Sequence, residues 1–494
     1  MDRSVAQGGL PDPDTSPWPG PGMARWISIL VGVLLALGAM AIYLATRTDR
    51  YYDHFVWQAA AFLEGQAAIR YPVDATAGLH GNAYFQDVLP IATSDGVPRG
   101  LLPFPPLPAV VLLPFVALWG LATDAQTIFT ILAAVDVAIC WWALGALRIR
   151  QSVRLGTTIF FAVGTVFWYT AQVATTWYQA HVVAVGLSFL AIGIALRGDR
   201  APELALEPGD RPAPASPGPW GGASSRIGAV FRLDRRQFVA GLLLGLATTA
   251  RLTVVFGAPF LAFVGSGGGW RRRAWSAGVG LAIPIGALVI YNLVTNGHVF
   301  SPAYDYLYAL EANGYPSLGY HPDWSMEDPR YLPQNFGIAF LGLPDVLPRF
   351  LPDSLAVQPI AVCTDPGAVR GLFDLGCPLA VPRDVGMSFI LTSPAYLLAI
   401  PALGRVRRSR PLAGAIAAVV LITVANLMHF SQGWVQFGYR FSLDAAPFAL
   451  VVVALGWERL VGRWRWGPAV AVVLLVASIA VNLWGVIWSR LLGW

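Results

Sequence analysis

The chain has 494 residues, of which 56% are hydrophobic and 12% are charged, and its mean hydropathy is +0.57. Because a soluble globular protein carries about 25% charged residues, this composition excludes a soluble enzyme and indicates an all-α polytopic membrane protein. The net charge of +5 at pH 7 requires no nucleic-acid partner, since all 33 basic residues are arginines that cluster in short loops. The use of arginine without lysine hints at a GC-rich bacterial source, and we therefore expect the bacterial inner membrane.

The chain begins with a polar segment and continues as a series of apolar runs. Residues 1–25 are expected to form a disordered cytoplasmic N-terminus, because they are rich in proline and glycine. No cleavable signal peptide is evident, since the run at 26–46 is long enough to remain as an anchor. Runs that approach or reach the length of a bilayer span follow at 102–120, 126–147, 155–173, 178–196, 238–267, 274–294, 387–403, 411–430, 441–456 and 467–488.

Arginine-rich connections between these runs predict the topology. They lie at 148–154, 197–236, 270–273, 405–410 and 458–465. The positive-inside rule places short basic segments on the cytoplasmic side of the membrane. This placement fixes whether an odd or an even number of crossings separates each connection from the next.

Two of the apolar runs cannot be simple spans if all the basic connections are cytoplasmic. The run at 102–120 contains five prolines, which remove backbone donors, so we expect a juxtamembrane helix against the outer leaflet. The run at 238–267 would bury Arg251 in mid-membrane as one helix, at a cost of about 2.5–3.5 kcal/mol. Two short helices that meet near Arg251 avoid this cost. The prediction is a bundle of about eleven spans with its C-terminus outside.

These assignments divide the chain into transmembrane modules joined by polar segments. We expect an N-terminal module at 26–196 with a first outer loop at 47–125, a disordered cytoplasmic linker at 197–236, a hairpin and span at 237–294, an outer loop at 295–386 and C-terminal helices at 387–494. Cys363 and Cys377 share the long outer loop and could either form a disulfide or remain free.

Two aspartates open the first outer loop. Asp49 and Asp53 are four residues apart, so they would point the same way from one helical face. Carboxylates at the membrane–water boundary cost free energy unless they are solvated or paired, which makes them candidates for function. They could also be solvated residues at the end of a helix, with Arg47 and Arg50 as local partners.

Other polar residues gather on the same predicted face. They are Asp87, Arg99, Gln179, His181, Arg251, Tyr291, Asn292, His298, Arg440 and Asp444. Carboxylates that face two arginines suit group transfer from a phosphate-activated donor, because arginine forks hold phosphate and a carboxylate accepts the proton of an attacking hydroxyl. Arg440 could instead be an interface residue whose charge reaches toward water, and His181 could be a hydrogen-bonded structural histidine.

In this order of features the sequence resembles the GT-C superfamily of polyprenyl-phosphate-sugar glycosyltransferases, which includes protein O-mannosyltransferases and aminoarabinose transferases. The segment TDRYYDHFVWQAAAFLEG is similar to the acidic head of their first outer loop. LLPFPPLPAVVLLPF is similar to their proline-containing juxtamembrane element, and ATTARLTVV to a short helical pair with a basic residue at its outer turn. The resemblance covers most of residues 26–456 and rests on the order and spacing of loose motifs.

The resemblance implies a role for each candidate residue. Asp49 or Asp53 would be the catalytic base, and Arg251 would bind the lipid phosphate with help from Arg440 and Arg99. The substrates would be lined by Asp87, Gln179, His181, Tyr291, Asn292 and His298. The sugar would move with inversion from a donor that enters sideways from the outer leaflet to an extracytoplasmic glycan, lipid or protein.

The sequence departs from the family at two places and implies no cofactor. The nearest cation before the proline element is Arg99, where relatives often have lysine or histidine, and the second outer loop has Gln179 and His181 where some have an acidic residue. None of the six histidines has the HxxxH or HExxH spacing of a metal site. No Walker or dinucleotide motif is present.

Two other functions remain open at this point. A transporter or lipid flippase would have inverted repeats and broken helices at the bilayer midplane. An oligosaccharide ligase or polymerase that uses diphosphate-linked donors would keep the arginines but require a larger outer cavity. For the glycosyltransferase we expect the lipid bilayer, the lipid-linked donor and the acceptor as partners, and a monomer.

Overall fold

The computed structural model describes residues 21–49, 52–70, 87–91, 96–97, 99–199, 232–314, 321, 323–351, 360–431, 433 and 435–494. The disorder expected at 1–25 and 197–236 falls largely outside the described residues.

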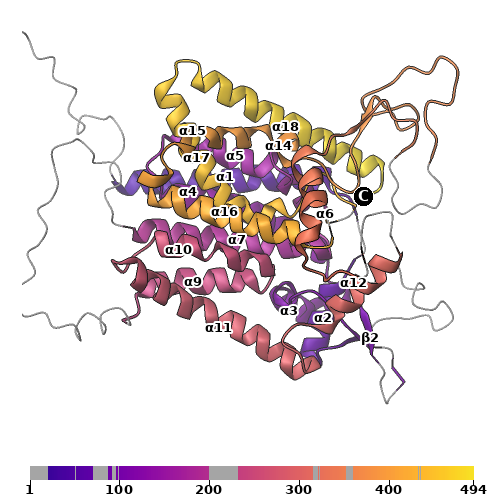
Figure 1. The fold of residues 1–494 in the computed structure, drawn as a ribbon, viewed down its shortest axis with the longest axis horizontal. Coiled ribbons are helices and arrows are strands. Elements are labelled where there is room, and N and C mark those ends of the chain that lie inside the picture. The colour runs from indigo at the N-terminus through magenta and orange to yellow at the C-terminus, as the bar shows by residue number, and fades with distance from the viewer. Residues whose placement is uncertain are drawn as a thin grey trace, which may run out of the picture.

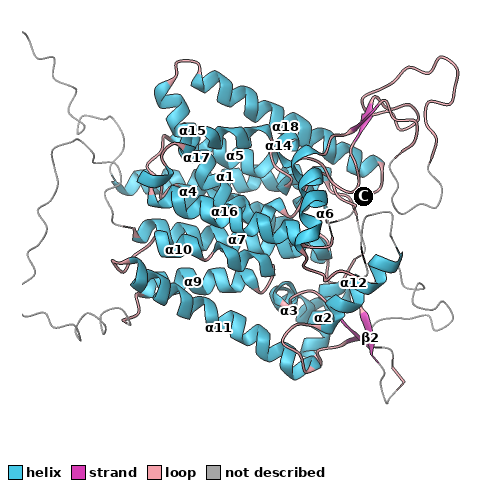
Figure 2. Ribbon diagram, viewed as in Figure 1, coloured by secondary structure: helices cyan, strands magenta, loops and turns pink. Residues whose placement is uncertain are grey.

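The chain folds into a bundle of long helices that run side by side, with loops at both ends (Figures 1 and 2). Seven helices in the described ranges are long and apolar enough to cross a membrane, which confirms the all-α polytopic class. They are α1 (Pro21–Thr46), α4 (Ala125–Leu144), α7 (Thr176–Gly198), α11 (Trp270–Asn296), α16 (Arg410–Met428), α17 (Ser442–Arg463) and α18 (Gly467–Leu491).

Shorter helical pieces complete the bundle where the sequence breaks the helix. They are α5 (Gln151–Val163) with α6 (Phe167–Val173), α9 (Arg235–Thr248) with η4 (Leu252–Gly257) and α10 (Pro259–Phe263), and α14 (Phe389–Thr392) with η8 (Pro394–Ala399) and α15 (Ile400–Leu403). Prolines stand at the first or second positions of α10, η8 and α15, where the missing N–H costs least. α5 with α6 forms one broken pass, and α14 with η8 and α15 forms another, while α9 and η4 with α10 form an antiparallel pair of short passes. Together with the seven long helices, these four passes agree with the eleven that the arginines predict.

The predicted hairpin at 238–267 is present, with Arg251 at its turn. The side chain of Gln237 in the first turns of α9 donates hydrogen bonds to the carbonyls of Leu261 (2.6 Å) and Val264 (3.2 Å) in and after α10. The chain has therefore returned to the level at which α9 began. This reversal lifts Arg251 to the opposite end of the hairpin.

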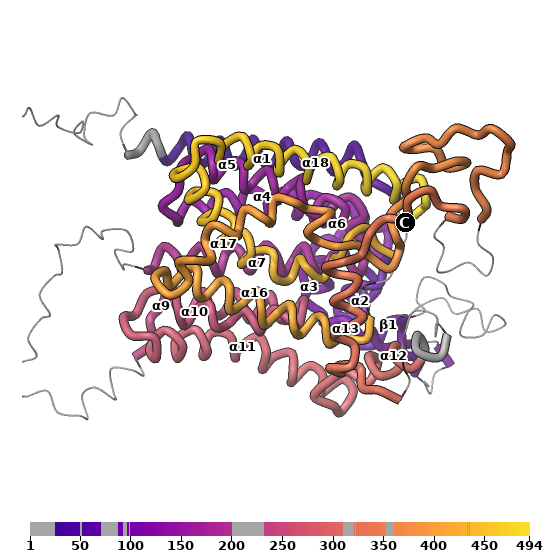
Figure 3. Tube along the Cα trace, turned by 45° about the horizontal axis from the view of Figure 1, so that its top comes forward, coloured from indigo at the N-terminus to yellow at the C-terminus, as the bar shows by residue number. Residues whose placement is uncertain are grey.

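The arginine-rich connections lie together at one end of the bundle, which we call the arginine end. Arg150, before α5, pairs with Glu458 near the end of α17 at 3.1 Å. Arg410, at the start of α16, pairs with Asp199 after α7 at 3.5 Å. The beginnings of α9 and α11 lie at this end too (Figures 1 and 3). The helix order thus satisfies the parity that the charge pattern predicted.

The opposite end, which we call the loop end, carries the short elements. The first loop contributes α2 (His54–Leu63), three short antiparallel strands in the order β1-β3-β2, α3 (Leu107–Trp119) and η3 (Gly120–Ala122). The strands are β1 (Ile69–Arg70), β2 (Leu89–Ile91) and β3 (Arg99–Leu101). The long loop contributes α12 (Pro302–Gly314), η6 (Pro329–Tyr331), α13 (Leu332–Phe336), a π-helical turn η7 (Gly337–Leu341) and the hairpin of β4 (Asp345–Val346) and β5 (Ala380–Val381), whereas η9 (Val406–Arg408) lies at the arginine end.

The proline-rich run at 102–120 does not cross the bundle. Its helical part, α3, has 13 residues, about 20 Å at 1.5 Å per residue, which is too short for a span. Its first amide, that of Leu107, donates to the carbonyl of Thr249 at the end of α9 (3.3 Å). This hydrogen bond holds the start of α3 against the turn of the hairpin at the loop end.

Glycines bring α9 and α11 into backbone contact. A Cβ on Gly241 would lie 2.0 Å from the carbonyl oxygen of Ala277, and one on Gly280 would lie 2.1 Å from that of Phe238. No larger residue fits at either position, and small residues are how membrane helices pack closely. This contact fixes the hairpin against α11.

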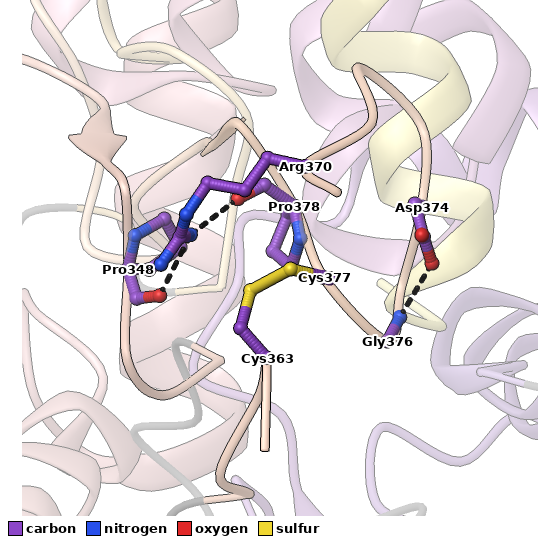
Figure 4. The surroundings of a disulfide bond; sticks show 7 residues. All are labelled: Pro348, Cys363, Arg370, Asp374, Gly376, Cys377 and Pro378. Atoms are coloured by element: carbon purple, nitrogen blue, oxygen red, sulfur yellow. Dashed lines mark hydrogen bonds between the residues drawn. A yellow bond between two sulfur atoms is a disulfide. The ribbon is translucent and has the colours of Figure 1, made fainter. Parts of the chain in front are cut away.

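The long loop holds a disulfide between Cys363 and Cys377 (Figure 4). Around it, the Arg370 guanidinium donates to the carbonyls of Pro348 (3.1 Å) and Pro378 (2.7 Å). Of the two alternatives left open by the sequence, the structure has the paired one. The disulfide and Arg370 together close the segment between β4 and β5.

Candidate functional site

A buried carboxylate, Asp444, organises the loop end of the bundle. It lies in the first turn of α17 and is 1% exposed. It accepts hydrogen bonds from Arg251 through Nε (3.1 Å) and Nη2 (2.9 Å), and from the Thr253 hydroxyl (2.7 Å). The Asn426 amide donates at 3.3 Å and His181 Nδ1 lies at 3.0 Å. With five contacts from four residues, its hydrogen-bonding capacity is used up.

The local structure explains how Arg251 meets this carboxylate. α9 ends at Thr248, and Arg251 then adopts an extended conformation (φ −138°, ψ 105°) before η4. Asp444 stands at the beginning of α17, where free backbone N–H groups favour a negative charge. The resulting fork is bidentate, and the arginine side chain is 22% exposed. The Arg251 charge is thus compensated by protein, whereas the sequence predicted a role on a donor phosphate.

Arg440 lies near the same aromatic ring as Arg251. Its guanidinium carbon is 5.5 Å from the centre of the Phe441 ring and 5.1 Å from that of Tyr178, while Arg251 lies 4.9 Å from Phe441. The Arg440 guanidinium makes no hydrogen bond or ion pair with the described residues, and its Nε is buried. Of the two arginines, Arg440 is therefore the one whose guanidinium makes no ion pair with the described residues.

Asp87 is a carboxylate of the first loop, and the charge of Arg440 lowers its pKa. It is 4% exposed and accepts a 2.9 Å hydrogen bond from the Trp177 indole N–H. Burial raises the pKa of Asp87 to about 6, although the Trp177 hydrogen bond and the positive charge of Arg440 both lower it. Among the ion pairs of the described residues there is none between Asp87 and Arg440.

The two aspartates at the head of the loop are placed differently. The side chain of Asp49 is 76% exposed and pairs with Arg47 at 3.2 Å. Asp53 precedes α2 and is half-buried, and its carboxylate takes no hydrogen bond in the described part of the chain. Burial raises its pKa, and the negative charge of Asp124 adds to this effect. The structure therefore brings Arg251 and Arg440 together without bringing Asp49 or Asp53 into contact with either of them.

Three further candidates make contacts within the fold or point outward. Gln179 donates to the carbonyl of Ala174 (3.0 Å) at the start of α7. Arg99 on β3 donates to the side chain of Gln66 at 3.2 Å. His298 lies exposed beyond the end of α11. Of the two candidates in the predicted second outer loop, Gln179 and His181, the buried His181 is the one that contacts Asp444.

An apolar cavity of ≈ 470 Å³ lies at the loop end, between α2, α3, α9 and α11. Its walls include Phe62, Leu107, Leu246 and Leu288, with Tyr291 as the predicted residue among them. Tyr291 accepts a 3.4 Å hydrogen bond from Gln58. The cavity lies beside α11, most of whose surface is exposed to the surroundings of the bundle.

A second cavity of ≈ 150 Å³ adjoins the first. The two share Leu288 and Tyr291, and the second is also lined by Asn292 and Tyr304. Burial raises the pKa of Tyr304 to about 12, while the charge of Arg251 lowers it. The apolar cavity thus leads to a tyrosine within the electrostatic reach of the buried arginine.

Sequence reasoning missed the roles of Asp444 and Trp177. Asp444 was noted only as a polar residue near Arg440, although an acidic residue in the first turn of an apolar helix is a signal for a buried partner. Trp177 is not among the candidate residues that the sequence indicates. Within the described ranges no group of three histidine, cysteine, aspartate or glutamate side chains could hold a metal ion.

Comparison with known proteins yields one distant similarity. A scan against protein-family models finds no match, and a search of the curated proteins finds none. Among solved structures, the chain is similar to ArnT from Cupriavidus metallidurans, whose crystal structure has undecaprenyl phosphate bound. The similarity covers 95% of this chain and 76% of that chain, at 13% identity and a TM-score of 0.41. A likeness at this distance carries no argument about the activity or the residues of this chain.

Proposed function

We propose that this protein is an integral membrane glycosyltransferase that moves a sugar from a polyprenyl-phosphate donor to an extracytoplasmic acceptor. The observation that carries this proposal is the pair of arginines on Phe441, of which the Arg440 guanidinium makes no ion pair with the described residues. The positive charge of that guanidinium lowers the pKa of Asp87, a carboxylate of the first loop. A cation for phosphate and a carboxylate for a proton are the two groups that such a transfer requires.

The sidedness of the site follows from charge and chemistry. The connections at the arginine end belong in the cytoplasm by the positive-inside rule, so the loop end faces outward. The Cys363–Cys377 disulfide at the loop end is consistent with an oxidising compartment. In a bacterial inner membrane the sugar would therefore be transferred on the extracytoplasmic side.

The cavities support a donor with an apolar tail. The larger one is lined mostly by side chains of α2, α3, α9 and α11 and contains no charged residue among those that line it. An isoprenoid chain that entered sideways would be buried there without desolvating a charge. Its phosphate would then lie toward Tyr304 and the arginines, where Arg99 near the mouth could assist.

In the proposed reaction, Arg440 neutralises the phosphate while a carboxylate of the first loop accepts the proton of the acceptor hydroxyl. Arg251 acts by way of Asp444, which fixes the α9 turn beside Phe441. A charge-assisted hydrogen bond contributes about 1.5–3 kcal/mol, and one that strengthens as the phosphate leaves accelerates transfer. Inversion at the anomeric carbon follows from direct attack opposite the leaving phosphate.

The two rivals predict different arrangements of charge. A transporter or flippase would carry its polar site at the bilayer midplane between repeats, whereas Arg251, Arg440 and Asp87 are all at the loop end. A ligase for diphosphate-linked oligosaccharides would require a site larger than the ≈ 150 Å³ cavity beside Tyr304. Both observations favour the transfer of a single sugar.

A donor-consumption assay tests the proposal. The purified protein in liposomes would be given radiolabelled polyprenyl-phosphate mannose, glucose and aminoarabinose in turn, with membrane extract as a source of acceptors. We expect one donor to lose its label to an acceptor, and Arg440→Gln to slow that loss. Donors that cross the bilayer intact would identify a flippase, and labels that move only from nucleotide sugars would contradict the donor assignment.

A further inference from the structure

We infer that the second cavity, beside Tyr304, receives the sugar of the donor, and that this sugar is uncharged. The inference rests on the proposed function and adds to it the chemical class of the sugar. Neutral hexoses and pentoses belong to this class, whereas sugars with a free amine and uronic acids do not.

The two adjoining cavities differ in polarity. They share Leu288, Tyr291 and Thr295 of α11. Elsewhere the first cavity is walled mainly by apolar side chains, whereas amides and hydroxyls recur around the second, from Thr248, Asn292, Asn296, Ser301 and Tyr304. A mostly apolar site with a few polar groups at one end suits a ligand with an apolar tail and a small polar head. The tail of the donor would occupy the first cavity and its sugar the second.

The second cavity has hydrogen-bonding capacity left for a sugar. The Tyr304 hydroxyl makes no hydrogen bond with the described residues, and its side chain is half-buried. Asn292 donates through Nδ2 to the carbonyl of Val299 (2.8 Å), which leaves its Oδ1 as an acceptor. Phe104 adds an aromatic surface to the same lining. Hydroxyl groups and the C–H faces of a sugar ring are the partners that such a lining can take.

No charged side chain lines the second cavity. Two acids lie close to Tyr304, but neither is available to a ligand in the cavity. Asp305, which follows Tyr304 in α12, is exposed, and Glu327, whose charge raises the pKa of Tyr304, is paired with His429 at 2.7 Å. An ammonium group in this cavity would therefore lose its water without gaining a carboxylate, which costs free energy.

One arginine borders this lining without adding a net charge to it. Leu252, which lines the cavity, follows Arg251 in the chain. The Arg251 guanidinium is held by both oxygens of Asp444, at 3.1 and 2.9 Å, so its charge is compensated. A uronic acid in the cavity would therefore meet no unpaired cation in the lining, and the balance of charge favours a neutral sugar.

The donor preference of the wild type tests the inference directly. The donor-consumption assay would be run with polyprenyl-phosphate mannose, glucose, aminoarabinose and glucuronic acid. We expect the better neutral donor to have a kcat/KM about 100-fold or more above that of either charged donor, because a buried ionic group without a partner is strongly rejected.

A charge placed in the lining should change this preference. The Asn296 Oδ1 accepts a 3.0 Å hydrogen bond from the amide of His298, and an aspartate oxygen can accept the same bond. We expect Asn296→Asp to raise kcat/KM for aminoarabinose, relative to the neutral donor, by about 10–100-fold, the contribution of a charge-assisted hydrogen bond. Ala309→Asp adds the same charge at an exposed position of α12 and is the matched control, with an unchanged ratio.

Tyr304→Phe separates a contact with the sugar from a contact with the lipid phosphate. Loss of the free hydroxyl should lower kcat/KM for the neutral donor by about three- to tenfold, the contribution of one hydrogen bond. The affinity for undecaprenyl phosphate, which carries no sugar, should not change.

Three outcomes would overturn the inference. The first is a charged donor that the wild type uses with a kcat/KM within about tenfold of the neutral one. The second is an Asn296→Asp variant whose donor ratio equals that of Ala309→Asp. The third is a Tyr304→Phe variant that loses undecaprenyl phosphate affinity as much as donor use. In each of these the wild type transfers a sugar, so the proposed function stands. A wild type that consumes none of the four donors would refute both.

Discussion

Replacing Asp87 by asparagine should make the protein more stable at neutral pH while it removes activity. Burial raises the pKa of this carboxyl from 3.8 to about 6, so the folded protein binds the proton more tightly than the unfolded chain. Between these two values stability falls as pH rises, because only the unfolded form releases the proton there. Above pH 6 the loss is complete.

The size of the effect follows from the two pKa values. A difference of one in pKa corresponds to about 1.4 kcal/mol, so the change from 3.8 to about 6 corresponds to about 3 kcal/mol. Asparagine carries no charge and can still accept the hydrogen bond of Trp177. Asp87→Asn should therefore raise the free energy of unfolding at pH 8 by up to about 3 kcal/mol, and by much less at pH 4.

Thermal unfolding in detergent or nanodiscs at pH 4, 6 and 8 measures this difference. We expect the unfolding temperatures of the variant and the wild type to diverge as pH rises. A stabilising substitution that abolishes turnover marks a group kept for function at a cost in stability. An Asp87→Asn protein that is less stable than the wild type at pH 8 would refute the reasoning and make the residue structural.

The remaining predictions concern the neighbours of this carboxylate and the outer loop. Arg440→Gln should weaken undecaprenyl phosphate binding about 10–100-fold, which corresponds to the loss of a charge-assisted hydrogen bond. It should also move the acid limb of the kcat profile to higher pH, because the guanidinium lowers the pKa of Asp87. An unchanged limb would show that the Arg440 charge does not act on Asp87. Asp444→Asn should lower the free energy of unfolding by about 3–5 kcal/mol, since it leaves a guanidinium buried without its partner; equal unfolding curves would contradict that pairing. Replacing Cys363 and Cys377 by serine should destabilise the loop by about 3 kcal/mol, as expected for a closed loop of this size, and speed tryptic cleavage there, whereas cleavage at the wild-type rate would show that the loop is held by other contacts.

The distribution of arginines made most of the fold predictable. Five connections rich in arginine fix the parity of crossings. The hairpin turn at Arg251 and the non-spanning run at 102–120 follow from that parity. Both rest on strong physical penalties, for a buried charge and for missing backbone donors. Penalties of this kind act on one segment at a time, so they can be evaluated without knowing which helices are neighbours.

The site was less predictable because its contacts are long in sequence. Arg251 and Asp444 are 193 residues apart, and Trp177 and Asp87 are 90 apart. A sequence pattern identifies each as polar near a membrane surface but does not say which pairs satisfy each other. This pairing matters for function. Arg251 pairs with Asp444 and has a structural role, whereas Arg440 has no carboxylate partner among the described residues and can bind a ligand.

The position of the phosphate in a cryo-EM structure of the protein with bound undecaprenyl phosphate tests the central claim most directly. We predict a phosphate oxygen within hydrogen-bonding distance of the Arg440 guanidinium, with the isoprenoid chain in the apolar cavity between α3, α9 and α11. A phosphate bound at the arginine end, or at the loop end but out of reach of Arg440, would contradict the account.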